Sequence, residues 1–499
     1  MTSPGVFTPY STIRNLMGTL PTWIPDPLDQ ERIMSYQVYE QIYWGVPETF
    51  KLVARGSEDR PIYVPTGRII VDTTHRYAAA GFDFAVDLRS GGDSSASSDA
   101  QAVTLAIEDL FTRERFKSKF NGNKRFGLIR GDWCWHIIAN PSKPQGSRIS
   151  IYPLDPASYF PIWDEDDLDR ILGCHIVDTV TDENDDVFIK RLTYRKKEDG
   201  PGVTVEEALF EVDDWGGPKS RPKKIIRPVE DLPPQITALP VYHIKNFEEP
   251  ANPFGSSELR GLERIIGAVN QTISDEELTL ALMGLGVYAT DAPPPTNDDG
   301  EEVPWELGPG RVVEHPAGSR FEKITGVGSV QPSQDHIAFL LRMMNEAAGV
   351  PDVARGKVDV SVAESGISLM LQMAPMLAKV EEKDQLILDT HDQMFFDLVR
   401  GWFPAYEATN FGEDVRVRGR VGEKLPLNRA AKLAELHEML AAKVISVQFF
   451  RAEATKLGYQ FPTNMDADII ASTRAITEAS VDPLGSRMSE EQDVNSPDE

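Results

Sequence analysis

The sequence has little cysteine and no long apolar segment. Cys134 and Cys174 are the only two cysteines among 499 residues. Two cysteines cannot form a disulfide framework, so the sequence indicates assembly in a reducing compartment, with a single bridge between them left open. It contains no apolar run of about eighteen residues, which predicts no membrane-spanning helix. The opening segment MTSPGVFTPYSTIRNLMGTL has no charged start followed by a continuous apolar stretch, so we expect no secretory signal.

The common catalytic motifs are also missing. No G-x-x-x-x-G-K-[ST] occurs, which argues against a P-loop nucleotidase. GLGVYAT and GPGRVV match a dinucleotide fingerprint only in part, and neither follows a strand and opens a helix. Neither H-E-x-x-H nor a pair of C-x-x-C motifs is found, so we expect no zinc site. We therefore predict no catalytic residues, no metal and no cofactor, and a protein that is not an enzyme.

Two acidic runs leave one enzymatic alternative open. DEDDLD (164–169) and DENDD (182–186) could hold Ca²⁺ or supply an acid–base pair. They do not have the glycine and glutamate positions of an EF-hand, which favours solvated turns between strands. A hydrolase that uses these carboxylates remains the enzymatic alternative. The basic stretch Arg113–Arg130 could contact phosphates or an acidic neighbour, or form a solvated helix face.

The charge balance is strongly acidic. The formal net charge is −27, whereas a protein that grips nucleic acid by its phosphates carries a basic face. A tight DNA binder is therefore disfavoured. The charge either keeps the protein soluble or forms a surface that DNA passes without sticking.

The first half of the chain reads as an α+β domain. We expect helices over 27–44 and 98–116, the second capped by Ser98 or Asp99. The short segments RPIYVP and RIIVDTT between them are rich in β-branched residues and predict strands. No helical pattern separates the later strand candidates, so we expect an antiparallel sheet. These candidates are WCWHIIAN, RISIYPL, LGCHIVDTV, VFIKRLTYR, EALFEV and PVYHIKN.

Helical periodicity returns after Pro253. Ser256 or Ser257 can cap a helix with one apolar stripe, and Glu258 and its charged neighbours are expected to keep the other face wet or salt-bridged to a neighbour. A Pro-, Gly- and acid-rich excursion follows, with strand-like RVVEH and RFEKI, and then a second amphipathic helix.

A loop then leads into the longest helical segment. Ser361 and Glu364 match a capping box. The helix that follows runs to about Phe403, roughly 60 Å, and Pro375 should bend it. The strand-like GEDVRVRGRVG comes next, followed by three short helix candidates in 427–444, 446–458 and 465–479, and by an acidic tail that we expect to be disordered.

This order of parts resembles that of the portal proteins of tailed phages, in particular those of siphophages that infect actinobacteria. LPVYHIKNFEEPANPFGSSELRGLERIIGAVNQTISD looks like the family's entry into its first stem helix. ELGPGRVVEHPAGSRFEKITGVGSVQPSQDHIAFLLRMMNEAAGVPDVA and VAESGISLMLQMAPMLAKVEEKD look like the exit from the clip, the second stem helix, the tunnel loop and the long wing helix. About a third of the chain carries these motifs.

The resemblance implies an α+β portal fold that forms a dodecameric ring at one capsid vertex. Double-stranded DNA would be packaged and ejected through its channel. The implied partners are the large terminase, head–tail adaptor proteins, and the major capsid and scaffolding proteins, in the host cytoplasm during assembly and then in the virion. The implied parts are a wing (1–253), a first stem helix (254–286), a clip (287–331), a second stem helix (332–349), a tunnel loop (350–363), a long kinked helix with a wing strand (364–425), a crown (426–479) and a tail (480–499).

The resemblance also assigns site residues. In the tunnel loop, Arg355 and Lys357 would touch phosphates weakly while Asp352 and Asp359 limit the grip. The full set of channel residues is Val353, Arg355, Lys357, Asp359 and Ser361, with Ser361 and Glu364 anchoring the loop and Pro375 forming the kink. Stem packing falls to Leu259, Leu262, Ile266, Val269, Ile273, Ile337, Leu340 and Leu341, and partner docking by the clip to Asp298, Asp299, Glu301, Glu302 and Trp305. The alternatives are an ordinary surface loop and, for the whole chain, another head–tail connector or minor capsid protein.

Overall fold

A computed structural model shows a mixed α and β protein. It describes residues 27–46, 49–50, 52, 61–88, 94–164, 166–167, 170–181, 186–212, 218–249, 252–285, 287–296, 300–305, 316–324, 329–357, 366–424, 429–456 and 459. The chain divides into two compact units, residues 1–424 and 425–499, which are described separately. No helix in the described residues is long and apolar enough to cross a membrane.

Four helices open the first unit. They are α2 (Pro27–Trp44), α3 (Thr66–Tyr77), α4 (Ser94–Glu114) and α5 (Phe116–Arg130). The expected helix over 27–44 is confirmed, because α2 buries its apolar residues at three- and four-residue spacing. The expected cap at Ser98 or Asp99 is wrong, because α4 begins at Ser94. The Asp99 carboxylate instead accepts a hydrogen bond of 3.1 Å from the Gly412 amide.

The two strands expected before α4 are wrong. Residues 61–65 have no regular structure, and RIIVDTT lies in α3. The buried residues of α3 include Gly67, Ile70, Val71 and Thr74, which recur at three and four residues and so form one helical face. Burial of this face outweighs the strand preference of the β-branched side chains.

Two antiparallel sheets follow, which confirms the antiparallel pairing but divides the strands expected in one sheet. The first has three strands in the order β3 (Ile149–Leu154), β2 (Asp132–Ala139), β9 (Val241–Lys245). The second has five strands in chain order, namely β4 (Tyr159–Trp163), β5 (Ile171–Thr181), β6 (Val187–Lys196), β7 (Val203–Glu211) and β8 (Lys224–Asp231). A short 3₁₀ turn, η2 (Pro156–Ser158), precedes β4. Strands β4 and β8 were not predicted from the sequence.

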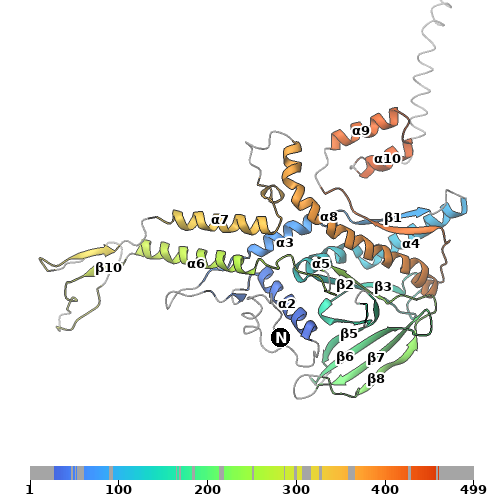
Figure 1. The fold of residues 1–499 in the computed structure, drawn as a ribbon, viewed down its shortest axis with the longest axis horizontal. Coiled ribbons are helices and arrows are strands. Elements are labelled where there is room, and N and C mark those ends of the chain that lie inside the picture. The colour runs from blue at the N-terminus through green and yellow to red at the C-terminus, as the bar shows by residue number, and fades with distance from the viewer. Residues whose placement is uncertain are drawn as a thin grey trace, which may run out of the picture. The chain divides into compact units, whose positions relative to one another are not determined.

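A helical hairpin extends from this body (Figure 1). It consists of α6 (Glu263–Leu285) and α7 (Gln331–Ala347), which lie side by side and antiparallel. Between them β10 (Val287–Thr290) pairs with β11 (Phe321–Ile324), which confirms the expected strand at RFEKI, whereas RVVEH lies outside the described residues. The expected cap of α6 at Ser256 or Ser257 is wrong, because α6 starts at Glu263.

The chain then turns back over the body. A 3₁₀ turn, η3 (Asp352–Arg355), leads toward α8 (Gly366–Asp397), which continues as a π-helical segment, η4 (Leu398–Glu407). Figure 1 shows α8 as a bent helix. Pro375 lies inside its N-terminal third, where it removes one backbone hydrogen bond. Strand β12 (Val415–Arg420) then pairs antiparallel with β1 (Asp83–Leu88).

The core of the first unit lies where α4, α5 and α8 pack on the three-stranded sheet. Phe116 stacks on Trp135 with ring centroids 5.0 Å apart, and Trp135 Nε1 donates to His391 Nε2 over 3.1 Å. All three side chains are buried in one continuous apolar cluster or enclosed by it. Cys134 and Cys174 are both buried and unbonded.

The second unit contains α9 (Arg429–Ala441) and α10 (Val447–Lys456), which contact each other. They confirm the first two of the three short helices expected here, with Leu436 and Ala454 buried. The third expected helix and the tail lie outside the described residues.

Candidate functional site

The best-defined candidate site is the base of the loop between α7 and α8. Val350 and Ala354 are buried, and the Tyr77 hydroxyl of α3 donates to the Ala354 carbonyl over 3.3 Å. Gly356 ends η3 in the left-handed conformation, with φ of 80°. The first half of the loop is therefore held against the body of its own chain.

The two cations expected in this loop have different surroundings. The Arg355 guanidinium forms an ion pair with Asp352, three residues earlier, and burial lowers the pKa of Arg355. Lys357 is exposed, and Val353 is half-buried. Asp359, Ser361 and Glu364 lie outside the described residues, so their expected roles remain predictions.

A buried ionic cluster lies next to the residues that precede the loop. Its members are Glu258, Lys379, Lys383 and Asn246, called here the anchor cluster. The carboxylate of Glu258, which precedes α6, pairs through its two oxygens with Lys379 and Lys383 of α8, the latter at 2.5 Å. Glu258 was expected to keep its helix face wet or salt-bridged to a neighbour. The second alternative is confirmed for Glu258, because its side chain is fully buried and paired with two lysines of α8.

The anchor cluster joins four segments of the chain. Lys379 Nζ donates to the Ala348 carbonyl at the end of α7, over 2.8 Å. Lys383 Nζ donates to Asn246 Oδ1 over 2.8 Å and lies 3.2 Å from the centroid of the Phe247 ring. Two ammonium groups of α8 thus link this helix to the end of β9, to the segment before α6 and to the end of α7.

The surroundings of the cluster shift the pKa values of Glu258 and Lys383. Burial alone would raise the pKa of Glu258, but the two lysines outweigh burial and lower it. Burial lowers the pKa of Lys383 to about 8, and attraction to Glu258 opposes that shift. Next to it, burial lowers the pKa of Lys124 to about 8, while its Nζ donates to the Ala78 carbonyl over 2.6 Å. Charged side chains held in low-dielectric surroundings need these partners.

Sequence reasoning missed the anchor cluster, although α8 contains a signal for it. Met376, Val380, Lys383 and Ile387 recur at three and four residues and are all buried. A lysine within an apolar stripe predicts a buried partner. The identity of that partner could not be found, because Glu258 lies on a distant segment.

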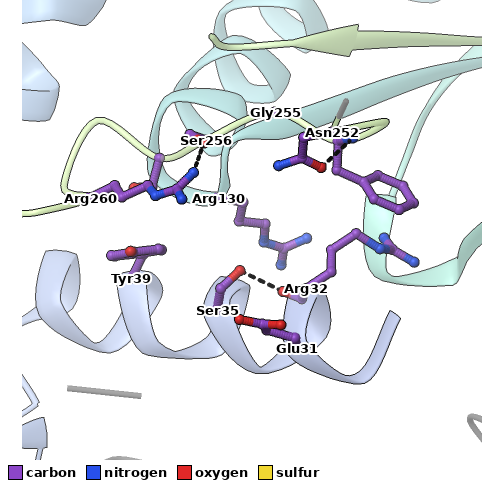
Figure 2. A pocket seen from close by; sticks show the side chains of 11 residues that line it. Glu31, Arg32, Ser35, Tyr39, Arg130, Asn252, Gly255, Ser256 and Arg260 are labelled. Atoms are coloured by element: carbon purple, nitrogen blue, oxygen red, sulfur yellow. Dashed lines mark hydrogen bonds between the residues drawn. The ribbon is translucent and has the colours of Figure 1, made fainter. Parts of the chain in front are cut away.

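A pocket of about 150 Å³ lies between α2 and the segment before α6 (Figure 2). Arg32, Arg130 and Arg260 line it, which raises the question of an anion site. All five N–H groups of Arg32 are already used, by Asp29 and Tyr36 and by the carbonyls of Pro156 and Tyr159. Arg130 pairs with Glu40 and Asp155, and Arg260 with Glu249. These arginines therefore connect segments of the fold.

A second buried network lies beside this pocket. Asp132 accepts hydrogen bonds from Tyr36 (2.5 Å), His243 (2.6 Å) and the Gly255 amide (2.7 Å). An Asp–His pair also occurs in catalytic triads. Here the carboxylate, which is fully buried, receives donors from α2, β9 and the segment before α6, and so fixes these three against β2.

The residues assigned to stem packing fall into two groups. Leu259, Leu262, Ile266 and Val269 are buried within the chain's own first unit. Leu259 and Ile266 reach Gly67 of α3, where an added Cβ would meet both side chains. Half-buried positions are taken by Ile273, Ile337, Leu340 and Leu341.

The assigned clip residues lie between β10 and β11. Glu301 and Glu302 are exposed, and the half-buried Trp305 contacts Phe321 of β11 edge-on, with centroids 5.6 Å apart. Asp298 and Asp299 lie outside the described residues.

The first acidic run and the basic stretch, considered above for other chemistry, have structural partners, whereas residues 182–185 of the second acidic run lie outside the described residues. In the first acidic run Asp164 pairs with Arg170 over 3.0 Å, closing a turn between β4 and β5. The basic stretch lies mainly in α5 and faces acidic neighbours. Lys117 forms an ion pair with Asp83, and Arg125 forms one with Asp72. Within the described part of the chain, no group of three His, Cys, Asp or Glu side chains is placed to hold a metal ion.

Comparison with protein-family models and with curated proteins found no match for this chain.

Proposed function

We propose that this chain is the subunit of a phage portal, a dodecameric ring at one capsid vertex through which double-stranded DNA is packaged and ejected. The observation that carries the proposal is the order α6, β10–β11, α7, loop, bent α8. Two antiparallel helices with a small β-hairpin at their far end, followed by a loop that returns along a long bent helix, form a stem and clip attached to an α+β wing.

The stem and clip account for docking. The β10–β11 pair lies at the end of the α6–α7 hairpin, away from the body (Figure 1), and Glu301 and Glu302, which lie between these strands in the sequence, are exposed. In a ring, these ends from every copy form a rim. That rim receives the terminase during packaging and the head–tail adaptor proteins afterwards.

The net negative charge of the chain supports a role as a channel for DNA. A chain of net charge −27 gains little from counterion release, so DNA is not held tightly as it passes. The loop carries Arg355, already paired with Asp352, and the exposed Lys357. Weak phosphate contacts at this one place let the channel guide DNA without arresting it.

The anchor cluster supports a mechanical role for the loop. A force on the loop reaches Ala348 and the middle of α8, where Lys379 and Lys383 transfer it to Glu258 in the segment before α6. Buried ion pairs with several hydrogen bonds resist such displacement. The loop therefore moves on a fixed base.

Electron microscopy of the purified full-length chain, with mass photometry alongside, tests the proposal. We expect rings of about twelve copies with an axial hole, since a heterologous contact that closes gives a ring. A chain that stays a compact monomer both alone and with capsid and scaffolding partners would overturn it.

A further inference from the structure

The α6–α7 hairpin leaves an apolar stripe of α7 uncovered. Phe339 is 49% exposed and Met343 is 41% exposed, four residues apart on one side of the helix. The side toward α6 and the body is already occupied by Ile337, Leu340, Leu341 and Met344. A hairpin of two helices cannot bury both stripes of α7 by itself.

The outer side of α6 has the opposite character. Arg264, Ala268, Thr272 and Asp275 follow one another at three- and four-residue spacing and so share one side of the helix. The two central residues are small, and Ala268 is exposed. This side is therefore a shallow surface with a cation at one end and a carboxylate at the other.

The two stripes lie at matching heights along the hairpin. Gln334 Nε2 of α7 donates to Glu276 Oε1 of α6 over 3.0 Å, which fixes the antiparallel register. Counting equal rises of about 1.5 Å from that point puts Met343 level with Gly267, one residue from Ala268, and Phe339 level with Gln271, one residue from Thr272. The same count puts Glu346 level with Arg264, and His336 level with Ser274, one residue from Asp275.

The stripes are complementary in charge as well as in size. If the stripe of α7 met the stripe of α6 on another copy, two large apolar side chains would face two small ones, Glu346 would face a guanidinium, and the imidazole of His336 would face a carboxylate that can accept its N–H. His336 and Phe339 are stacked, with centroids 6.4 Å apart, and both are exposed. Arg264 and Asp275 also interact within their own chain, so it is their charge that matters here.

We propose that the stripe of His336, Phe339, Met343 and Glu346 docks on the stripe of Arg264, Ala268, Thr272 and Asp275 of a second copy of this chain. The two surfaces differ, so the contact is heterologous and each copy uses both. This inference rests on the proposed portal ring and specifies which helix faces hold it together. It assigns the contact between copies to the outer stripes, whereas the inner stripes close the hairpin.

Disulfide trapping tests the contact directly. The variant Ala268→Cys with Met343→Cys, made in the full chain, should give oligomers joined by disulfides on oxidation, because the two positions face each other between copies. The matched control, Ala268→Cys with Leu105→Cys, uses a residue of α4 that is more exposed than Met343, at 60% against 41%, and should give none. Equal cross-linking of both pairs would overturn the proposal.

Substitution tests the same contact in solution. Phe339→Glu should raise the concentration needed for ring formation at least about ten-fold, whereas Leu105→Glu should not. Arg264→Glu alone should weaken the rings, and adding Glu346→Arg should restore them. The thermal midpoint of each variant, measured on dilute monomer, checks that folding is intact.

The outcomes separate the two proposals. Wild-type rings that persist unchanged in Phe339→Glu overturn this inference and leave the portal proposal standing. Open filaments that cross-link through Ala268→Cys and Met343→Cys support the contact and contradict the closed ring. A wild-type chain that is monomeric at every concentration, both alone and with capsid and scaffolding partners, overturns both.

Discussion

Lys383 Nζ lies 2.5 Å from Glu258 Oε1, and both side chains are closed to solvent. Lys379, one turn earlier on α8, pairs with the other oxygen of the same carboxylate. The two ammonium groups thus share one buried carboxylate. Asn246 Oδ1 also accepts a hydrogen bond from Lys383. Such a cluster adds less to stability than its Coulomb attraction suggests, but removing one member is costly.

The first prediction concerns the cost of removing one member of the cluster. Glu258→Gln keeps the size of the side chain and removes the only carboxylate that pairs with Lys379 and Lys383 in the described structure. The buried Lys383 and the half-buried Lys379 are then left without this counter-ion, so we expect the free energy of unfolding to fall by about 3–5 kcal/mol. Urea denaturation at pH 7 measures it.

An exposed ion pair provides the matched control. Asp109 pairs with Arg113 one turn away on α4 and is 71% exposed. Asp109→Asn should change the free energy of unfolding by less than about 1 kcal/mol. Equal effects of the two substitutions would show that Glu258 does not neutralise a buried charge.

The second prediction concerns the segment that positions Glu258. Gly131 has φ of 108°, and an added Cβ would lie 2.8 Å from the backbone carbon of Ser256. Gly131→Ala is therefore both strained and obstructed, and should cost more than about 2 kcal/mol. Gly122→Ala in α5 meets open space and should be neutral or stabilise by up to about 1 kcal/mol. Similar thermal midpoints for the two variants would contradict this reading.

The elements predicted from the sequence are those whose pattern is set locally. Helix α2 buries Tyr36, Tyr39 and Tyr43 at the spacing that predicted it, and most strands of the two sheets were found from their β-rich runs and turn residues. Strand β8 was missed because seven of its eight residues, including Ile225 and Val229, are exposed, so it has no buried alternation to detect.

The errors arose where distant segments decide the outcome. The sequence of α3 has the composition of a strand. It is helical in the fold because Ile42 and Leu259 pack against its Gly67 face. The burial of Glu258 depends on two lysines of α8, which no local pattern connects to it. At the start of the loop, Ala354 is buried and its carbonyl accepts a hydrogen bond from the distant Tyr77, which no local pattern predicts.

The third prediction concerns acid stability. His391 is buried, its Nδ1–H donates to the Ile387 carbonyl over 2.6 Å and its Nε2 accepts from Trp135, so both nitrogens suit the neutral ring. Burial lowers the pKa of His391 to about 4, below the ordinary value near 6.5. Between these values the unfolded chain binds a proton that the folded chain does not. Stability should therefore fall as the pH falls from about 6.5 toward 4.

The variant His391→Gln isolates this effect. Wild-type stability should drop by about 2 kcal/mol between pH 6.5 and pH 5 from this group alone. The variant should be less stable at pH 7 but lose less on acidification, since glutamine does not titrate. Urea denaturation at the two pH values measures both numbers. An unchanged pH dependence would mean that His391 is not the group that takes up the proton.

The last prediction tests the loop. Replacing Arg355 and Lys357 with alanine removes both cations of the described part of the loop and leaves the carboxylate of Asp352 without its ion-pair partner. The loop then repels phosphates, so DNA packaging or retention should fall while rings form normally. The swap Arg355→Lys with Lys357→Arg keeps both charges and should retain function, because weak contacts need charge rather than a fixed geometry. Packaging at the wild-type level in the alanine variant would remove the loop from the DNA path. Failure of the swapped variant as well would show that the Arg355–Asp352 pair shapes the loop, and that charge alone does not account for its role.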